Sequence, residues 1–283
     1  MKTYAVTSGK GGVGKTNISA NLAIALAERS QKVLVFDADI GLANLDVILG
    51  IKCPYKLQHV LMNEKRLSEI IQKGPGGIQF VAGGSGIESL VEMDGPAGDI
   101  FLSELVQIEE ENDILIFDTG AGLDENVMKF LSVADEILLV ITPDPASMTD
   151  SYATAKAIFK RKPMASIKVI MNMVDDEAEA KAVYARMNSV CQEFIGRSLG
   201  FAGYVRMDSK ATAYIRQRKP FIIGDPRLDA SQDVARMAAR LLGDVYIASG
   251  QSLADRIRNL YRKTVAVRGL IEVGGVLEKI GLR

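Results

Sequence analysis

The segment Gly9-Lys10-Gly11-Gly12-Val13-Gly14-Lys15-Thr16 decides the fold. It fits the pattern G-x-x-x-x-G-K-[ST] and lies between an apolar run, Tyr4–Ser8, and a helix-like pattern that starts at Lys15. The glycines let successive backbone N–H groups turn towards phosphate oxygens, and a following helix adds free donors and a favourable dipole. The segment therefore predicts a phosphate-binding loop between a strand and a helix.

The side chains of this loop predict a site for a magnesium nucleotide, ATP or ADP. We expect Lys15 to bridge the β- and γ-phosphates and the Thr16 hydroxyl to ligate Mg²⁺. The predicted nucleotide-binding residues of the loop are Gly9, Lys10, Gly11, Gly12, Val13, Gly14, Lys15, Thr16 and Asn17.

Strand-length apolar runs alternate with longer helical patterns along most of the chain. The predicted strands are Tyr4–Ser8, Val33–Asp37, Ile78–Ala82, Ile114–Asp118, Glu136–Thr142, Ile167–Asn172 and Leu199–Tyr204. The predicted helices are Lys15–Arg29, Asp99–Glu109, Asp124–Ala134, Met148–Phe159, Asp176–Ile195 and Ser231–Leu242. This alternation predicts an α/β fold, a single doubly wound and mostly parallel sheet with helices on both faces. We assign it to residues 1–250, with a helical tail over residues 251–283.

Composition excludes several classes of protein. The chain has 283 residues, a net charge of −1 and two cysteines, Cys53 and Cys191. It is too neutral overall for a strongly basic nucleic-acid binder, and it has too few cysteines for a disulfide framework or a four-thiolate metal site. We find no apolar run long enough to span a bilayer and no signal-peptide pattern, so a cytoplasmic location is expected.

The near-neutral total hides an uneven distribution of charge. Residues 251–283 carry a net charge of +4, which leaves −5 on residues 1–250. Apolar residues recur at helical spacing among the basic ones, as in Leu253, Ile257 and Leu260. Such a tail can lie on an anionic membrane surface, at the inner face of the cell membrane, or it can pack against its own domain.

Polar side chains end several of the predicted strands. Asp37 and Asp39 follow the second strand, Asp118 follows four apolar residues in the fourth, and Asn172 ends the sixth. In parallel sheets ligands bind beyond the carboxyl ends of the strands, where buried carboxylates need a cation or hydrogen-bond donors. We expect Asp118 to act near the metal. Asn172 suits the edge of adenine, with a turn-forming role as the alternative.

A second lysine, Lys10, directly after the first glycine makes the chain resemble the MinD/ParA family of deviant P-loop ATPases. The resemblance implies that two ATP-bound subunits face each other and that Lys10 reaches the partner's phosphates. It also implies that the catalytic residues are Lys10, Lys15 and Asp39. Asp39 would position the attacking water, and Thr16, Asp37 and Asp118 would be the metal residues. It further implies that Asn172 reads the base.

Three stretches resemble the flagellar-number regulators FlhG/FleN within this family: Asp118-Thr-Gly-Ala-Gly122, Tyr55–Leu61 and Thr149–Ala153. That resemblance implies spatial or numerical regulation of flagella, and a regulatory partner such as a flagellar GTPase, a transcription activator or a basal-body component. This chain starts directly at its first strand, so we do not expect the N-terminal GTPase-stimulating extension of FlhG-type proteins.

Other destinations remain open from the sequence. Within the family these are a MinD-type regulator of the division site or a ParA-type DNA-partitioning ATPase. The basic runs Lys160–Lys162 and Arg216–Lys219 could contact DNA, but no aromatic platform accompanies them, so DNA is not the expected partner. Two alternatives come from other classes of protein. One is a P-loop phosphotransferase. The other is a reductase or metal-carrier partner, which would need cysteines that bind a metal cluster, and Cys53 and Cys191 show no such pairing.

Overall fold

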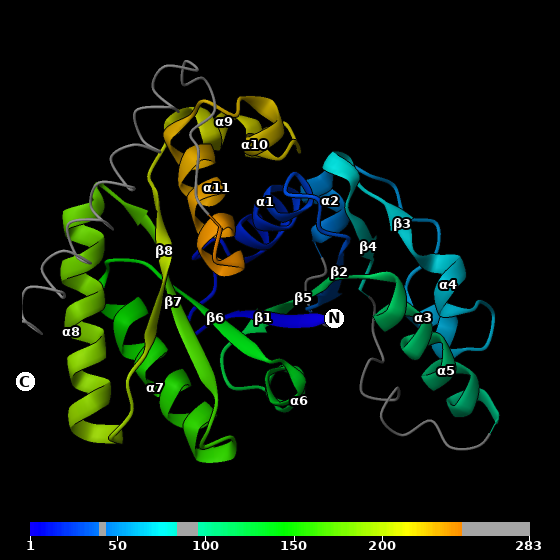
Figure 1. Ribbon diagram of the computed structural model, residues 1–283, viewed down its shortest axis with the longest axis horizontal. Helices are drawn as coiled ribbons and strands as arrows, with labels where there is room; N and C mark the ends of the chain where they lie inside the picture. Colours follow the sequence, from blue (N-terminus) through cyan, green and yellow to red (C-terminus); the bar gives the residue numbers. More distant parts are fainter. Residues whose placement is uncertain (40–43, 84–95, 245–283) are drawn as a thin grey trace, which may run out of the picture. The chain divides into compact units, whose positions relative to one another are not determined.

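The computed structural model describes residues 1–39, 44–83 and 96–244. Its strands form one sheet in the order β3-β4-β2-β5-β1-β6-β7-β8 (Figure 1). Every pairing is parallel except the short antiparallel pair of β3 and β4. The strands are β1 (Lys2–Ser8), β2 (Val33–Ala38), β3 (Gln72–Lys73), β4 (Gln79–Val81), β5 (Ile114–Ala121), β6 (Glu136–Ile141), β7 (Ser166–Val174) and β8 (Gly200–Arg206).

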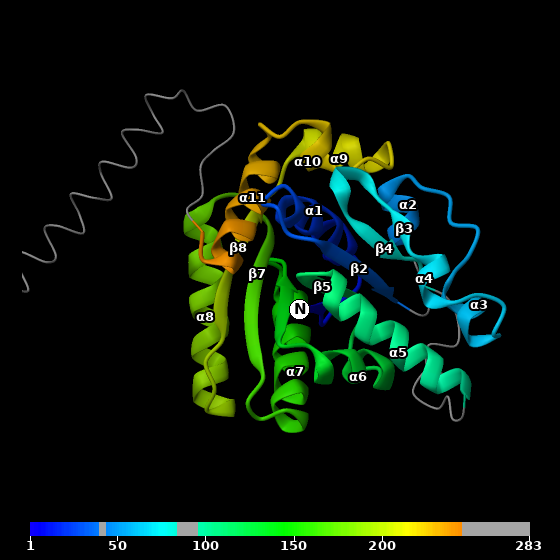
Figure 2. The ribbon, with the colours of Figure 1, turned by 45° about the vertical axis from the view of Figure 1, so that its right-hand side comes forward.

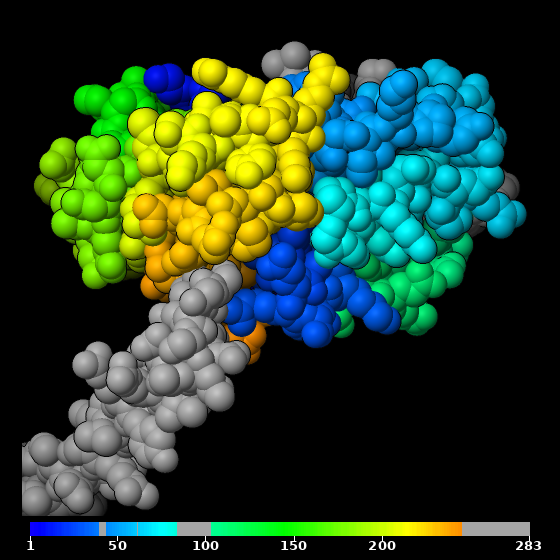
Figure 3. Space-filling view, turned by 90° about the horizontal axis from the view of Figure 1, so that it is seen from above, coloured from blue at the N-terminus to red at the C-terminus, as the bar shows by residue number. Residues whose placement is uncertain are grey.

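Helices cover both faces of this sheet (Figures 1 and 2). One face carries α1 (Lys15–Ala27), α2 (Leu45–Leu49), α10 (Phe221–Gly224) and α11 (Asp229–Leu242), with α9 (Ser209–Arg216) beside α10. The other carries α3 (Leu57–Leu61), α4 (Leu67–Ile70), α5 (Pro96–Glu111), α6 (Glu125–Val133), α7 (Pro145–Arg161) and α8 (Glu177–Ile195). A 3₁₀ turn spans Pro75–Gly77. On the surface, the yellow and orange helices α9 to α11 adjoin the blue N-terminal segment (Figure 3).

The central strands are mainly apolar because both of their faces are buried. In β6, Leu138 and Val140 pack into the core beneath α1 and α11, whereas Leu139 and Ile141 pack into the core beneath α6, α7 and α8. All four side chains are fully buried. Neighbouring residues of this strand therefore pack into two different cores on opposite faces of the sheet. Such a strand is stable only when helices cover both faces.

The structure confirms the predicted fold class and all seven predicted strands, with ends that differ by a few residues. The sequence reading missed β3, which has two residues, and the short helices α2, α3, α4, α9 and α10, none longer than 8 residues. Segments this short carry too few periodic positions to form a pattern. The predicted tail, 251–283, and the domain boundary after residue 250 lie outside the described residues.

Helix α8 is the longest helix in the described parts of the chain, with 19 residues. Its buried residues, Ala180, Val183, Met187 and Cys191, recur every three or four positions and face the sheet. The other side of α8 is polar. Within residues 1–39, 44–83 and 96–244, no helix combines the length and apolar character needed to cross a membrane.

Candidate nucleotide-binding site

The predicted site residues converge at one edge of the sheet, where the parallel strands end. The glycine-rich loop, residues 9–14, connects β1 to α1, and Asp37 pairs in register with Asp118 across β2 and β5. Asp144 follows β6, and Asn172 lies near the end of β7. Residues that are far apart in the sequence are therefore brought together at the edge of a parallel sheet where ligands bind.

Two glycines of the loop have backbone conformations that other residues rarely adopt. Gly12 has φ +80° and Gly14 has φ +89°. Gly14 directly precedes α1, and the carbonyl of Gly14 accepts a hydrogen bond from the Ile18 N–H at 2.9 Å. A side chain on Gly14 would also strike the amide nitrogen of Asn172. The loop thus bends sharply into the helix, so that N–H groups at the start of α1 point to the open side.

Gly9 is required for a different reason, because it packs against the backbone of α7. A Cβ at this position would lie closer than 3.0 Å to backbone atoms of Asp150 and Ser151. Gly11 has open space around it and an ordinary φ. We predict that Gly9→Ala lowers the free energy of unfolding by about 1–3 kcal/mol, whereas Gly11→Ala changes it little. Urea unfolding of both variants checks this, and equal stability of the two would contradict the close packing.

Lys15 and Asp118 form a buried, oppositely charged pair of groups beneath the loop. The exposed fraction of Lys15 is 9%, and that of Asp118 is 1%. Burial lowers the pKa of Lys15, an effect that Asp118 and Asp39 oppose. Burial raises the pKa of Asp118 to about 6, although hydrogen bonds from the hydroxyls of Ser19 and Thr16 oppose this. Charges this deep are costly unless further groups of opposite charge join them.

Asp37 adds a second buried carboxylate beside Asp118. Its Oδ2 accepts a hydrogen bond from the Leu45 N–H at 3.2 Å, and its Oδ1 accepts one from the Asp39 N–H at 3.3 Å. Burial, followed by the neighbouring Asp118, raises the pKa of Asp37 to about 7. Two adjacent carboxylates and the Thr16 hydroxyl form an oxygen-only donor set, which is the set that Mg²⁺ prefers. The residues present therefore fit a magnesium ion.

The raised pKa of Asp37 makes the stability of the nucleotide-free protein depend on pH. From its ordinary value of 3.8 up to about 7, the folded state holds a proton that the unfolded state releases. Stability therefore falls as pH rises through this window. We predict a smaller fall for Asp37→Asn than for the wild type in urea unfolding at pH 5.5 and pH 7.5. Equal falls in the two proteins would contradict the role of Asp37.

Lys10 lies at the rim of the site and forms an ion pair within its own subunit. Its Nζ lies 3.3 Å from Oδ1 of Asp144, and the two side chains are 45% and 44% exposed. Asp144 also accepts hydrogen bonds from the Thr142 hydroxyl at 2.5 Å and the Ser147 N–H at 2.9 Å, and with Lys10 these lower the pKa of Asp144 to about 2. Water screens an ion pair this exposed, so Lys10 can leave Asp144 at little cost.

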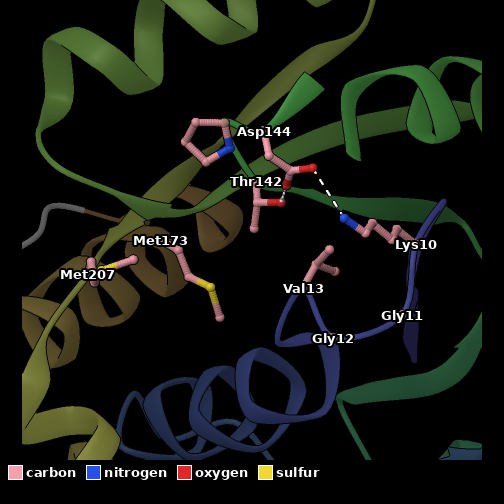
Figure 4. Close-up of a pocket in the computed structure, with 9 residues that line it drawn as sticks. Lys10, Gly11, Gly12, Val13, Thr142, Asp144, Met173 and Met207 are labelled. Atoms are coloured by element: carbon pink, nitrogen blue, oxygen red, sulfur yellow. Dashed lines mark hydrogen bonds and ion pairs between the residues drawn. The ribbon is translucent and has the colours of Figure 1, made fainter. Parts of the chain in front are cut away.

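An open hollow of about 280 Å³ lies against the loop at this point. Figure 4 shows Lys10 and Asp144 at one end and the side chains of Met173 and Met207 at the other, with Val13 between them. The side chain of Met207 is 66% exposed. Met173 has a φ of +58°, a positive value that is rare for residues other than glycine. The hollow is therefore charged at one end and apolar at the other. That combination suits a ligand with an anionic group and an apolar ring.

The structure places the remaining predicted nucleotide residues close to the loop. The Asn172 side-chain amide donates a hydrogen bond to the Val13 carbonyl at 2.7 Å, so in this structure it braces the loop. Oδ1 of Asn17 is buried and has no hydrogen-bond partner in the described structure. Oδ1 of Asp39 lies 3.5 Å from where a Cβ would stand on Gly120. Asp39 therefore faces the segment that follows Asp118.

The sequence alone did not indicate two polar residues of the site. Ser19 and Thr142 have no motif of their own, and their roles emerge only from contacts with Asp118 and Asp144. Asp144 caps α7. In the loop that follows β8, Asp208 caps α9, Arg206 pairs with buried Asp233, and Met207 lines the hollow.

The features behind the rival functions lie away from the site. Cys53 packs beside the core on the α1 face of the sheet, and Cys191 is buried on the opposite face. In the described structure, the two thiols therefore cannot meet within one subunit. Of the basic runs, Arg161 pairs with Glu125, and Lys162 donates to carbonyls that end α6. Arg161 and Lys162 thus have contacts within the chain.

Comparisons with known proteins agree with this geometry. The family model described as the CobQ/CobB/MinD/ParA nucleotide binding domain matches residues 4–221. The chain is 34% identical over 231 residues to the antiactivator FleN of Pseudomonas aeruginosa, covering 82% of each chain. It is 37% identical over 270 residues to the flagellum site-determining protein YlxH of Helicobacter pylori, covering 95% of this chain and 91% of the relative.

Among solved structures, the MinC:MinD cell division complex of Aquifex aeolicus contains a similar chain. The TM-score is 0.70 at 25% identity, covering 87% of this chain and 98% of the other. The glycine-rich loop with its lysines and the strand-end aspartates all lie within the range matched by the family model. This chain belongs to the CobQ/CobB/MinD/ParA family of nucleotide-binding proteins.

Proposed function

We propose that this protein hydrolyses ATP and forms a homodimer while ATP is bound, and that this switch regulates the number or position of flagella. The single observation that carries the proposal is the place of Lys10. It lies in the phosphate loop at the open rim of the site, and within the described residues its ammonium forms a half-exposed ion pair with Asp144. A lysine there is free to meet the phosphates of a second subunit and to make hydrolysis depend on dimerisation, as a catalytic arginine supplied by a partner protein does.

The remaining residues divide the work within one subunit. The N–H groups of residues 9–16 and the Lys15 ammonium bind the phosphates, and Asp39 orients the attacking water. Thr16, Asp37 and Asp118 hold the metal. Mg²⁺, when bound, supplies the charge that neutralises the phosphate oxygens. The two buried carboxylates, whose pKa values are raised in the protein alone, support this assignment.

The flagellar part of the proposal rests on the similarity to the flagellum site-determining protein YlxH, and it agrees with the resemblance to the FlhG/FleN regulators and the similarity to the antiactivator FleN; both relatives match over most of their length. A flagellar GTPase, a transcription activator or a basal-body component would read the dimer. The tail, residues 251–283, with its charge of +4, would attach ATP-bound dimers to the inner face of the cell membrane. Co-sedimentation with anionic vesicles tests that attachment: it should require ATP rather than ADP and should be lost without residues 251–283.

A division-site regulator is the second candidate, supported by the similarity to MinD of Aquifex aeolicus and, at 25% identity over 253 residues, to the septum site-determining protein MinD of Bacillus subtilis. Deleting the gene in its host separates the two. Altered flagellar number or placement with normal division supports the flagellar role, whereas misplaced septa with normal flagella support the division role. Complementation with Lys15→Ala, which removes the phosphate-binding ammonium, should fail in either case.

A further inference from the structure

Ser19 contacts the carboxylate that the site uses for its metal, although no nucleotide motif includes it. Its hydroxyl donates a hydrogen bond to Oδ1 of Asp118 at 2.7 Å. Ser19 is fully buried, and Asp118 is 1% exposed, so water cannot replace this contact. Ser19 stands four residues after Lys15, one helical turn further along the same side of α1. The phosphate-binding helix therefore holds the β5 carboxylate directly.

Asp118 has two hydroxyl partners with different duties. Thr16 also hydrogen-bonds to Asp118, but its hydroxyl is the one assigned to the metal. Ser19 lies deeper along the helix and has no assigned contact with nucleotide or metal. A hydrogen bond to one oxygen of a carboxylate restricts rotation about its Cβ–Cγ bond. The other oxygen then points in a defined direction. Hydrogen bonds to a charged acceptor are stronger than neutral ones and fix geometry well.

We propose that Ser19 is a positioning residue that orients Asp118 for the divalent metal of the nucleotide complex. The inference rests on the proposed function, because it takes Asp118 as a metal residue. Partners that orient the groups around a metal commonly affect its affinity by about 10- to 100-fold. Ser19 acts only through Asp118, so its loss should weaken metal binding without removing any phosphate contact.

Ser231 offers a matched control. It is another fully buried serine, on α11, and its hydroxyl donates to the Asp225 carbonyl at 2.8 Å. Ser19→Ala and Ser231→Ala each remove one buried hydroxyl and one short hydrogen bond. Both should lower the urea midpoint of unfolding, since each removes one hydrogen bond from a buried acceptor. Only Ser19→Ala should alter metal binding.

The test is a Mn²⁺ titration of the full chain with saturating ADP, in which the loss of the free Mn²⁺ electron paramagnetic resonance signal reports binding. We expect the Mn²⁺ dissociation constant to rise by about 10-fold or more for Ser19→Ala and to stay at the wild-type value for Ser231→Ala. The Ser19→Thr variant keeps a rotatable hydroxyl and should therefore retain most of the wild-type affinity for Mn²⁺. Wild-type affinity in folded Ser19→Ala, or an equal loss in both alanine variants, would overturn the proposal. Because Mn²⁺ uptake with ADP needs no dimer, a failure of dimerisation would defeat the proposed switch without changing this result.

Discussion

Replacing Lys10 with alanine should lower the rate of ATP hydrolysis by about 10³-fold and leave the protein monomeric with ATP. In the structure the ammonium of Lys10 stands at the open rim, 3.3 Å from Asp144, whereas Lys15, the proposed phosphate ligand within the subunit, is buried. A charge placed at the rim contributes fully only when a second subunit closes the site. Phosphate release and size-exclusion chromatography with ATP measure the two losses.

Two controls distinguish the proposed role of Lys10 in the partner's site from the role of its ion pair with Asp144. ADP binding by Lys10→Ala should stay close to wild type, because the loop N–H groups and Lys15 remain. Asp144→Ser removes the acceptor of Lys10 but keeps a residue that caps helices well, so α7 should persist and dimerisation should survive. Unchanged turnover in Lys10→Ala would refute the role across subunits, and loss of dimerisation in Asp144→Ser would show that the internal ion pair is what matters.

Replacing Asp39 with alanine should slow hydrolysis by about 10²- to 10⁴-fold while ATP binding persists. Asp39 is half-buried, its carboxylate lies close to Gly120, and it is not one of the groups assigned to bind the phosphates. Its loss should therefore remove the group that orients water and keep every contact that binds ATP. The ATP-bound dimer then accumulates, since the step that would dissolve it is slow.

Retention of radiolabelled ATP on the purified variant measures this effect. Asp46→Ala is the matched control: Asp46 is the next described acidic residue after Asp39, yet its carboxylate pairs with Lys56 on the side of α2. Asp46→Ala should hydrolyse ATP at the wild-type rate. Rapid hydrolysis by Asp39→Ala, or failure to retain ATP, would contradict the assignment.

The fold was predictable because its strands carry an unusually plain signal. Runs such as residues 137–141 are apolar on both faces, and a glycine-rich loop marks the step from β1 into α1. The strand-end rule then named Asp37 and Asp118, which the structure pairs in register. Periodicity and position along the chain were sufficient for each of these assignments.

The features that the sequence did not predict depend on contacts between distant segments of the chain. Asp144 and Lys10 are 134 positions apart, and Ser19 and Asp118 are 99 apart, so no local pattern links them. The bracing of Val13 by Asn172 depends on the close approach of β7 to the loop. The short helices α2 to α4 owe their place to tertiary packing of residues such as Leu45, Leu57 and Leu67, all fully buried. Sequence periodicity cannot report such packing.

The mass of the protein in solution tests the central claim most directly. Light scattering of the wild type and of Asp39→Ala, with Mg²⁺ and either ATP or ADP, compares the two nucleotide states. We expect the 30.6 kDa of one chain with ADP and twice that mass with ATP, most completely for Asp39→Ala. One mass in both nucleotides for both proteins would contradict an ATP-dependent dimerisation switch.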